Sequence, residues 1–280
     1  MIKSNKQWAV ALLIIAATVS LPKTLCSAEI SSFVNVINRV QPRVVKIYGS
    51  GGLKRLEAFQ SGFLISADGH ILTAWSYVLD SEEFINVVLH DGRRFGAKMV
   101  NHDPRFEIAI LKIETEDTPH FNLTDAVKLE PGARVLAFSN LFGIAAGNEP
   151  VSVLHGSVAA TTELAARRGA FQAMYRGPVY VLDAMTNNPG AAGGVLTDRK
   201  GQLAGVLGKE LRNSLDNTWL NYAIPISELS TSINDMLAGR TPPRRDDENA
   251  KKPANAHSPA SLGNILVADI LPKTPQFIDD

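Results

Sequence analysis

Short apolar runs separated by turn residues dominate the sequence between positions 44 and 226. In order, the runs are VVKIYG, SGFLIS, HILTAW, INVVLH, IAILKI, RVLAFS, VSVLHGSV, VYVL, GGVLTD, QLAGVLG and LNYAIPI. Most are bounded by turn dipeptides such as Asp68-Gly69 and Asp91-Gly92. Many short strands with few helices between them predict an all-β barrel or sandwich. The polar stretch Glu114–Asp125 predicts a division into two such units.

Helical spacing of apolar residues is confined to the two flanks of this β region. It appears first at Phe33, Ile37 and Val40. It returns at Leu229, Ile233, Met236 and Leu237, followed by Gly239 in the position of a helix C-cap. We therefore predict an N-terminal helix and a C-terminal helix around the β region.

The first 28 residues have the layout of a secretory signal peptide. A basic start, MIKSNK, precedes the apolar run WAVALLIIAATVSL, and small residues allow cleavage after Ala28. The alternative is an uncleaved anchor, but the run is shorter than the roughly 20 residues that span a bilayer. Cleavage predicts a periplasmic or secreted protein with no stable membrane anchor. It also removes Cys26, the single cysteine, so the mature chain has no disulfide.

Composition narrows the classes of function. The chain is 45% hydrophobic and 20% charged, which is typical of a globular protein. Loss of Lys3, Lys6 and Lys23 with the signal leaves 25 basic against 28 acidic residues, a net charge of −3. That charge gives no reason to expect a nucleic-acid partner. Neither metal-ligand spacing nor a cofactor motif occurs, so we expect no metal and no cofactor.

The chain changes character after residue 240. Residues 241–261 are rich in charge, proline and alanine, which predicts a linker. Residues 262–280 turn apolar again and predict the start of another folding unit, too short here for a domain. The predicted organisation is thus a signal peptide (1–28), a β domain (29–240), a linker (241–261) and this final segment (262–280).

Three passages together resemble the HtrA/DegP branch of the trypsin-like serine proteases. They are SGFLISADGHILTAWSYVLD (61–80), DPRFEIAILKI (103–113) and NPGAAGGVL (188–196). The resemblance implies a double six-stranded antiparallel β-barrel with a site between the barrels. It also implies that residues 262–280 begin a PDZ-like domain.

The residues at the positions of the family's catalytic triad differ from the triad itself. The resemblance places Ser76 at the histidine, Glu107 at the aspartate and Ala192 at the nucleophilic serine. The reaction needs a nucleophile, a base and a group that orients the base. The sequence therefore predicts a non-catalytic pseudoprotease. We also consider a Ser76–Glu107 hydrogen bond, and filling of the lost imidazole's space by Trp75 and Tyr77, with ordinary core packing as the alternative.

By the resemblance, residues 188–196 correspond to the family's nucleophile loop. The glycines of this loop remain. By the resemblance, Gly190, Ala191 and Ala192 form the oxyanion hole, which predicts binding of peptides or unfolded protein segments. The alternative is an inert scaffold, in which the loop is kept only because the barrel needs its turn. The family also implies a homo-oligomer, such as a trimer, or assembly with an active paralogue. Two alternatives stay open: an active serine endopeptidase that uses displaced groups, and a structural subunit of a protease assembly.

Overall fold

The structure is a computed structural model that describes residues 33–49, 59–79, 84–164, 167–168, 171–172, 175–211 and 219–240. The predicted signal peptide, linker and final segment (1–28, 241–261 and 262–280) lie outside these described residues. Among the helices within them, none has the length and apolar character needed to cross a membrane.

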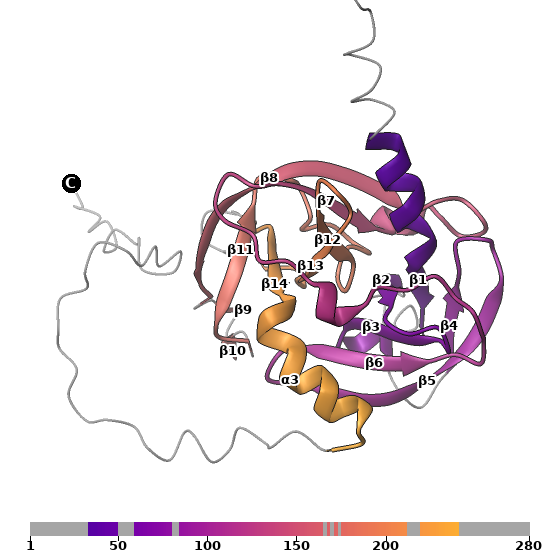
Figure 1. Ribbon diagram of the computed structural model, residues 1–280. Helices are drawn as coiled ribbons and strands as arrows, with labels where there is room; N and C mark the ends of the chain where they lie inside the picture. Colours follow the sequence, from indigo (N-terminus) through magenta and orange to yellow (C-terminus); the bar gives the residue numbers. More distant parts are fainter. Residues whose placement is uncertain are drawn as a thin grey trace, which may run out of the picture. The chain divides into compact units, whose positions relative to one another are not determined.

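Two closed, six-stranded antiparallel barrels form the fold, as predicted (Figure 1). In the first barrel the order is β1-β2-β3-β6-β5-β4. Its strands are β1 (Val44–Tyr48), β2 (Phe59–Leu64), β3 (His70–Ala74), β4 (Ile85–Val88), β5 (Arg94–Asp103) and β6 (Ile108–Lys112). In the second barrel the order is β11-β14-β13-β12-β7-β8. Its strands are β7 (Arg134–Ser139), β8 (Ser152–Glu163), β11 (Pro178–Leu182), β12 (Val195–Asp198), β13 (Leu203–Leu207) and β14 (Tyr222–Pro225).

The remaining elements are short connections and two helices at the flanks. Residues 33–40 are helical, and α3 (Ile226–Leu237) follows β14 directly. Gly239, with a φ of 70°, lies just beyond the C-terminus of α3, where the sequence predicts it. The connections contain η1 (Gln41–Arg43), η3 (Tyr77–Leu79), η4 (Leu123–Asp125), η5 (Leu141–Gly143) and the small hairpin β9 (Arg167–Arg168) and β10 (Phe171–Gln172). The predicted division at Glu114–Asp125 is confirmed, because this stretch lies between β6 and β7.

One barrel strand, β5, escapes the search for apolar runs. It is longer than its neighbours, and its residues alternate between more and less exposed positions along most of its length. Its inward-facing Phe95, Ala97 and Met99 pack against the core of the first barrel, while the exposed Gly96 and Lys98 separate them. A strand buried on one face alternates in this way and shows no continuous apolar run.

Each barrel is filled by the inward side chains of its own strands. The first core contains Val45, Ile47, Leu64, Ile71, Leu79, Ile85, Val87, Leu89, Ala109, Leu111 and Ile113. The second contains Leu129, Val135, Ala137, Val158, Tyr180, Leu182, Leu196, Ala204, Leu207 and Ala223. Small barrels of this kind are filled by side chains and hold no channel. Ligands of this fold must therefore bind outside the two cores.

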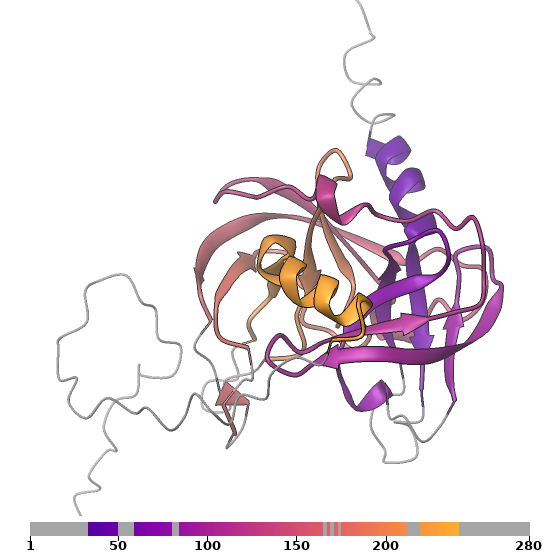
Figure 2. The ribbon, with the colours of Figure 1, turned by 60° about the horizontal axis from the view of Figure 1, so that its bottom comes forward.

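Helix α3 joins the two barrels, and a buried carboxylate anchors it. The helix contacts β13 and β14 of the second barrel and also β5 and β6 of the first (Figure 2). At the end of β5, the fully buried Asp103 accepts a 2.6 Å hydrogen bond from the hydroxyl of Ser232 on α3. Arg105 adds a two-pronged contact, with N–O distances of 3.0 and 2.7 Å. Burial raises the pKa of Asp103, but the hydrogen bonds from Arg105 and Ser232 outweigh it and hold the pKa below its usual value.

We expect Asp103→Asn to lower the free energy of unfolding by about 2–3 kcal/mol at pH 7, because the ion pair and a charge-assisted hydrogen bond are lost. A carboxylate whose pKa is lowered by folding stabilises the folded state at pH values above its unfolded pKa. This contribution is lost as the pH falls through the folded pKa. The difference between wild type and variant should therefore shrink below about pH 4. Urea unfolding at several pH values measures it. Asp91→Asn, at an exposed turn, is the control and should cost under about 1 kcal/mol; equal losses would contradict the anchoring role of Asp103.

Candidate active-site cleft

The structure brings the three predicted triad positions together where the barrels meet. The amide of Ser61 on β2 donates a 3.0 Å hydrogen bond to the carbonyl oxygen of Ala192. The amide of Trp75, beside Ser76, donates a 2.8 Å hydrogen bond to the carbonyl oxygen of Glu107. The nucleophile loop thus lies against β2 and the end of β3, and Glu107 lies against the residue that precedes Ser76.

The nucleophile loop has a conformation that depends on glycine. Gly190 and Gly193 have φ values of 84° and 77°. A Cβ on Gly193 would lie 2.4 Å from the carbonyl oxygen of Ser61 and 2.5 Å from the amide nitrogen of Ala74. Both contacts are far shorter than real Cβ contacts, and their partners are backbone atoms with no room to move. This segment can approach the first barrel only because it has no side chain.

The loop places two amide groups at the predicted oxyanion-hole positions. Among the described residues, the amides of Gly190 and Ala192 donate no hydrogen bond to another residue. The carbonyl group of Gly190 is held in place, because its oxygen accepts a 2.6 Å hydrogen bond from the hydroxyl of Ser61. Ala191 is buried and does not reach a ligand with its side chain. Two donors held in a fixed loop suit a carbonyl or carboxylate oxygen.

The Ser76 hydroxyl is turned to its own barrel. It donates a 2.5 Å hydrogen bond to the side-chain oxygen of Gln60 on β2 and accepts one from the amide of Val78 at 3.1 Å. The Gln60 amide group is itself held by the Thr73 hydroxyl at 2.7 Å. The suggested hydrogen bond between Ser76 and Glu107 is therefore wrong, because the single hydroxyl proton goes to Gln60.

Glu107 is paired with a lysine that the sequence analysis missed. The Glu107 carboxylate, 5% exposed, lies 2.7 Å from the Nζ of Lys209, and this Nζ also donates to the carbonyl oxygen of Trp75 at 3.0 Å. Glu107 has a φ of 54°, an uncommon conformation for a residue with a side chain. Lys209 follows β13, far from Glu107 in sequence, and no local pattern marks it.

The aromatic residues beside Ser76 do not close the site. The Trp75 ring stacks on His102 with a centroid distance of 4.8 Å, and it packs against the core of the first barrel. For Trp75, this is the ordinary core packing that was the alternative to filling the space of an imidazole. The Tyr77 side chain is 44% exposed. Next to Ser76 an open pocket of about 420 Å³ remains, and both rings line it.

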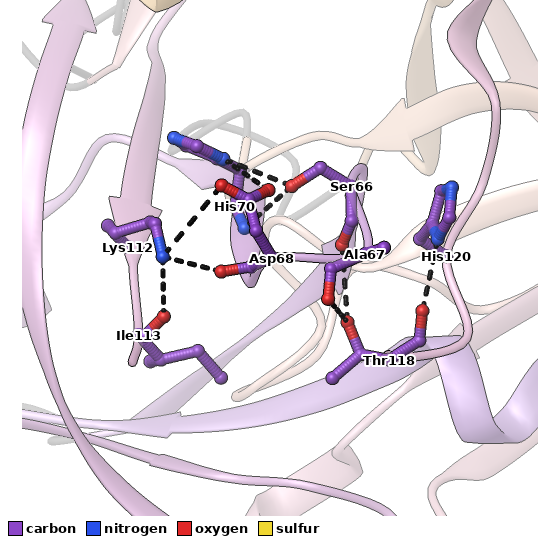
Figure 3. A network of polar contacts seen from close by, with 8 residues as sticks. All are labelled: Ser66, Ala67, Asp68, His70, Lys112, Ile113, Thr118 and His120. Atoms are coloured by element: carbon purple, nitrogen blue, oxygen red, sulfur yellow. Dashed lines mark hydrogen bonds and ion pairs between the residues drawn. The ribbon is translucent and has the colours of Figure 1, made fainter. Parts of the chain in front are cut away.

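A second place with a hydroxyl and an imidazole lies in the β2–β3 turn (Figure 3). The Nδ1 of His70 lies 3.0 Å from the hydroxyl of Ser66 and 3.1 Å from the carboxylate of Asp68. Both oxygens contact the same ring nitrogen, whereas a catalytic triad uses the two nitrogens separately. His70 begins the strand that ends before Ser76, so the cluster lies roughly 20 Å from the cleft at the usual rise per strand residue. The group stabilises a turn and does not replace the triad.

Comparison with known proteins agrees with this architecture. Residues 60–206 match the family model described as a trypsin-like peptidase domain. The chain belongs to the trypsin-like peptidase family. A "Probable periplasmic serine endoprotease DegP-like" of Marinomonas sp. (strain MWYL1) is 34% identical over 63% of this chain and 35% of the relative. Its counterpart in Pseudomonas fulva (strain 12-X) is 32% identical over 73% of this chain and 40% of the relative.

A solved structure extends the likeness. The structure named "HtrA-type protease AlgW with tripeptide" has a TM-score of 0.59 and 27% identity, over 74% of this chain and 64% of that one. The resemblance to the HtrA/DegP branch is thus confirmed. This chain spans only about a third to two fifths of the length of these curated relatives. No residue that the structure describes tests the predicted PDZ-like segment.

We expect Gly193→Ala to destabilise the protein by about 3 kcal/mol or more, because backbone overlap adds to the strain of a positive φ. Gly132→Ala is the matched control: its φ is 87°, and nothing lies within 4 Å of the added Cβ. That variant should lose only about 1–2 kcal/mol. Chemical unfolding measures both. Equal losses would show that the close approach to Ser61 and Ala74 carries no weight.

We expect Lys209→Met to lower the free energy of unfolding by about 2–4 kcal/mol, because the carboxylate of Glu107 stays buried without this cation. The double variant Glu107→Gln with Lys209→Met should lose clearly less than the sum of the single variants. Urea unfolding of all four proteins gives the coupling, which we expect to be at least about 1 kcal/mol. A coupling near zero would mean that solvent already screens the pair.

Proposed function

We propose that this protein is a non-catalytic member of its family that acts in the periplasm or outside the cell. It binds extended peptides or unfolded protein segments in the cleft between the barrels. The chemistry of the three predicted triad positions carries the first part of this proposal, and the preserved nucleophile loop carries the second.

The groups at the triad positions supply no nucleophile–base pair. Ala192 presents a methyl group, the Ser76 hydroxyl is bound to Gln60, and the Glu107 carboxylate is bound to Lys209. Removing a triad costs about 10⁶-fold in turnover. An oxyanion hole and substrate binding alone retain roughly 10³–10⁴-fold over the reaction in water. That remainder does not sustain peptide hydrolysis on a biological timescale.

The surroundings of the lost triad still suit a peptide. Among the described residues the amides of Gly190 and Ala192 have no acceptor, which leaves them to donate to a ligand oxygen. The backbone after β13, which carries Lys209, borders the same cleft and suits pairing with an extended chain. The HtrA-type neighbour was solved with a tripeptide. This supports binding of peptide by a related chain, and we extend it to this one.

An active serine endopeptidase is the second candidate, because the curated relatives are named serine endoproteases. It would require a hydroxyl and an imidazole that converge on the cleft. The Ser66–His70 contact lies at the far end of β3 and does not converge on the cleft. His102 lines the pocket with Ser76, but its ring stacks on Trp75. We therefore rank this candidate below the binding function.

The test combines labelling, cleavage and binding. The protein should not react with a fluorophosphonate probe and should not cleave unfolded casein, and it should bind members of a peptide array. Ala192→Ser alone should remain unlabelled, because Ser76 stands at the position from which the family's histidine would take the proton of the new hydroxyl. Labelling of the wild type that disappears in Ser66→Ala would establish the displaced-group enzyme. An absence of peptide binding would leave the structural-subunit alternative.

A further inference from the structure

The pocket beside Ser76 has an unusual lining for a place next to a former catalytic site. Its volume is about 420 Å³, within the range of small-ligand pockets. The residues that line it are Trp75, Ser76, Tyr77, Leu79, Met99, His102 and Lys209. Most of this wall is aromatic or apolar, and it draws on both barrels.

The pocket exists because two polar groups are held at its edge. Ser76 is smaller than an imidazole, and Gln60 holds its hydroxyl through a 2.5 Å hydrogen bond. The ammonium of Lys209 is held between the carboxylate of Glu107 and the carbonyl oxygen of Trp75. Neither group needs to rearrange when a ligand enters, so the space is pre-organised.

The chemistry of the walls favours a flat aromatic ring. The indole of Trp75 is held in its plane by stacking on His102, and the Tyr77 ring remains 44% exposed. Aromatic rings pair with one another in offset or edge-to-face geometry. The thioether of Met99 makes favourable contacts with ring edges, and the ammonium of Lys209 adds attraction to a ring face.

A charged ligand suits the pocket less well. A carboxylate would compete with Glu107 for Lys209, which lies only 2.7 Å from its partner. A second cation would meet the ammonium of Lys209 at close range, and like charges in a partly buried site repel. The net charge of the Glu107–Lys209 pair is zero, so a neutral side chain encounters no uncompensated charge.

We propose that this pocket is a specificity site for an aromatic side chain, Phe, Tyr or Trp, of the bound peptide. This inference rests on the proposed peptide-binding function and adds its sequence preference. The main chain of the peptide lies along the cleft, and one aromatic residue enters the space that the missing imidazole leaves open.

Calorimetry on the full chain tests the preference with blocked alanine pentapeptides that carry Phe, Leu, Asp, Lys or Ala at the centre. A second probe, N-acetylphenylalanine amide, tests the pocket without a peptide main chain. We expect the Phe peptide to bind at least tenfold tighter than the Leu peptide and more tightly still than the Asp, Lys and Ala peptides.

Two variants and one control locate the preference. Tyr77→Ala removes a half-exposed wall and should weaken binding of the Phe peptide about tenfold, with little effect on the Ala peptide. Ser76→His places a ring in the pocket and should also remove the preference. Phe84→Ala deletes an aromatic side chain that is 88% exposed and lies outside the pocket lining, so it should change nothing.

The outcomes distinguish failure of the aromatic site from failure of the proposed peptide-binding function. If the peptides bind equally well, or if the Asp peptide binds best, the aromatic site is wrong and peptide binding stands. If only N-acetylphenylalanine amide binds, with loss in Tyr77→Ala, the aromatic site is supported and the peptide-binding function is wrong. If no probe binds, both are wrong.

Discussion

The hydrogen bonds of one buried serine determine how the two barrels meet. Ser61, on β2 of the first barrel, is fully buried. Its hydroxyl donates to the carbonyl oxygen of Gly190 and accepts from the amide of Asn140, and its amide donates to the oxygen of Ala192. A buried polar group costs free energy unless its hydrogen bonds are made, so these contacts hold the nucleophile loop at one position against β2. The site depends on that position.

The chemistry of the cleft follows from the same constraint. Because the loop is held by its backbone, its shape does not require a nucleophile, and an alanine at 192 leaves it intact. The side chains at the other two predicted triad positions are bound elsewhere, Ser76 to Gln60 and Glu107 to Lys209. The side chains of Ser76 and Glu107 thus contribute to the stability of the fold. The proposed peptide binding has a separate basis, namely that the amides of Gly190 and Ala192 donate no hydrogen bond to another described residue.

The fold was largely predictable from local sequence patterns, and one strand, β5, was not predicted. Apolar runs and turn dipeptides located every barrel strand except β5. That strand is buried on one face only, so the exposed Gly96 and Lys98 separate Phe95, Ala97 and Met99, and no apolar run appears. The boundary between the barrels was also visible, since the polar stretch Glu114–Asp125 has no apolar run and lies between β6 and β7. Closure of each barrel came from the family resemblance, because strand pairing is a long-range property.

Less of the candidate site than of the fold could be predicted from the sequence. Residue identity, read through the family resemblance, placed Ser76, Glu107 and Ala192 at the triad positions and predicted a site without a nucleophile and a base. It did not reveal the partners of these residues. Lys209 lies far along the chain from Glu107. The stacking of Trp75 on His102 joins the segment after β3 to β5. Such contacts leave no local signal, because they arise only when distant segments pack together. The open pocket beside Ser76 is their joint result, and only the tertiary structure shows it.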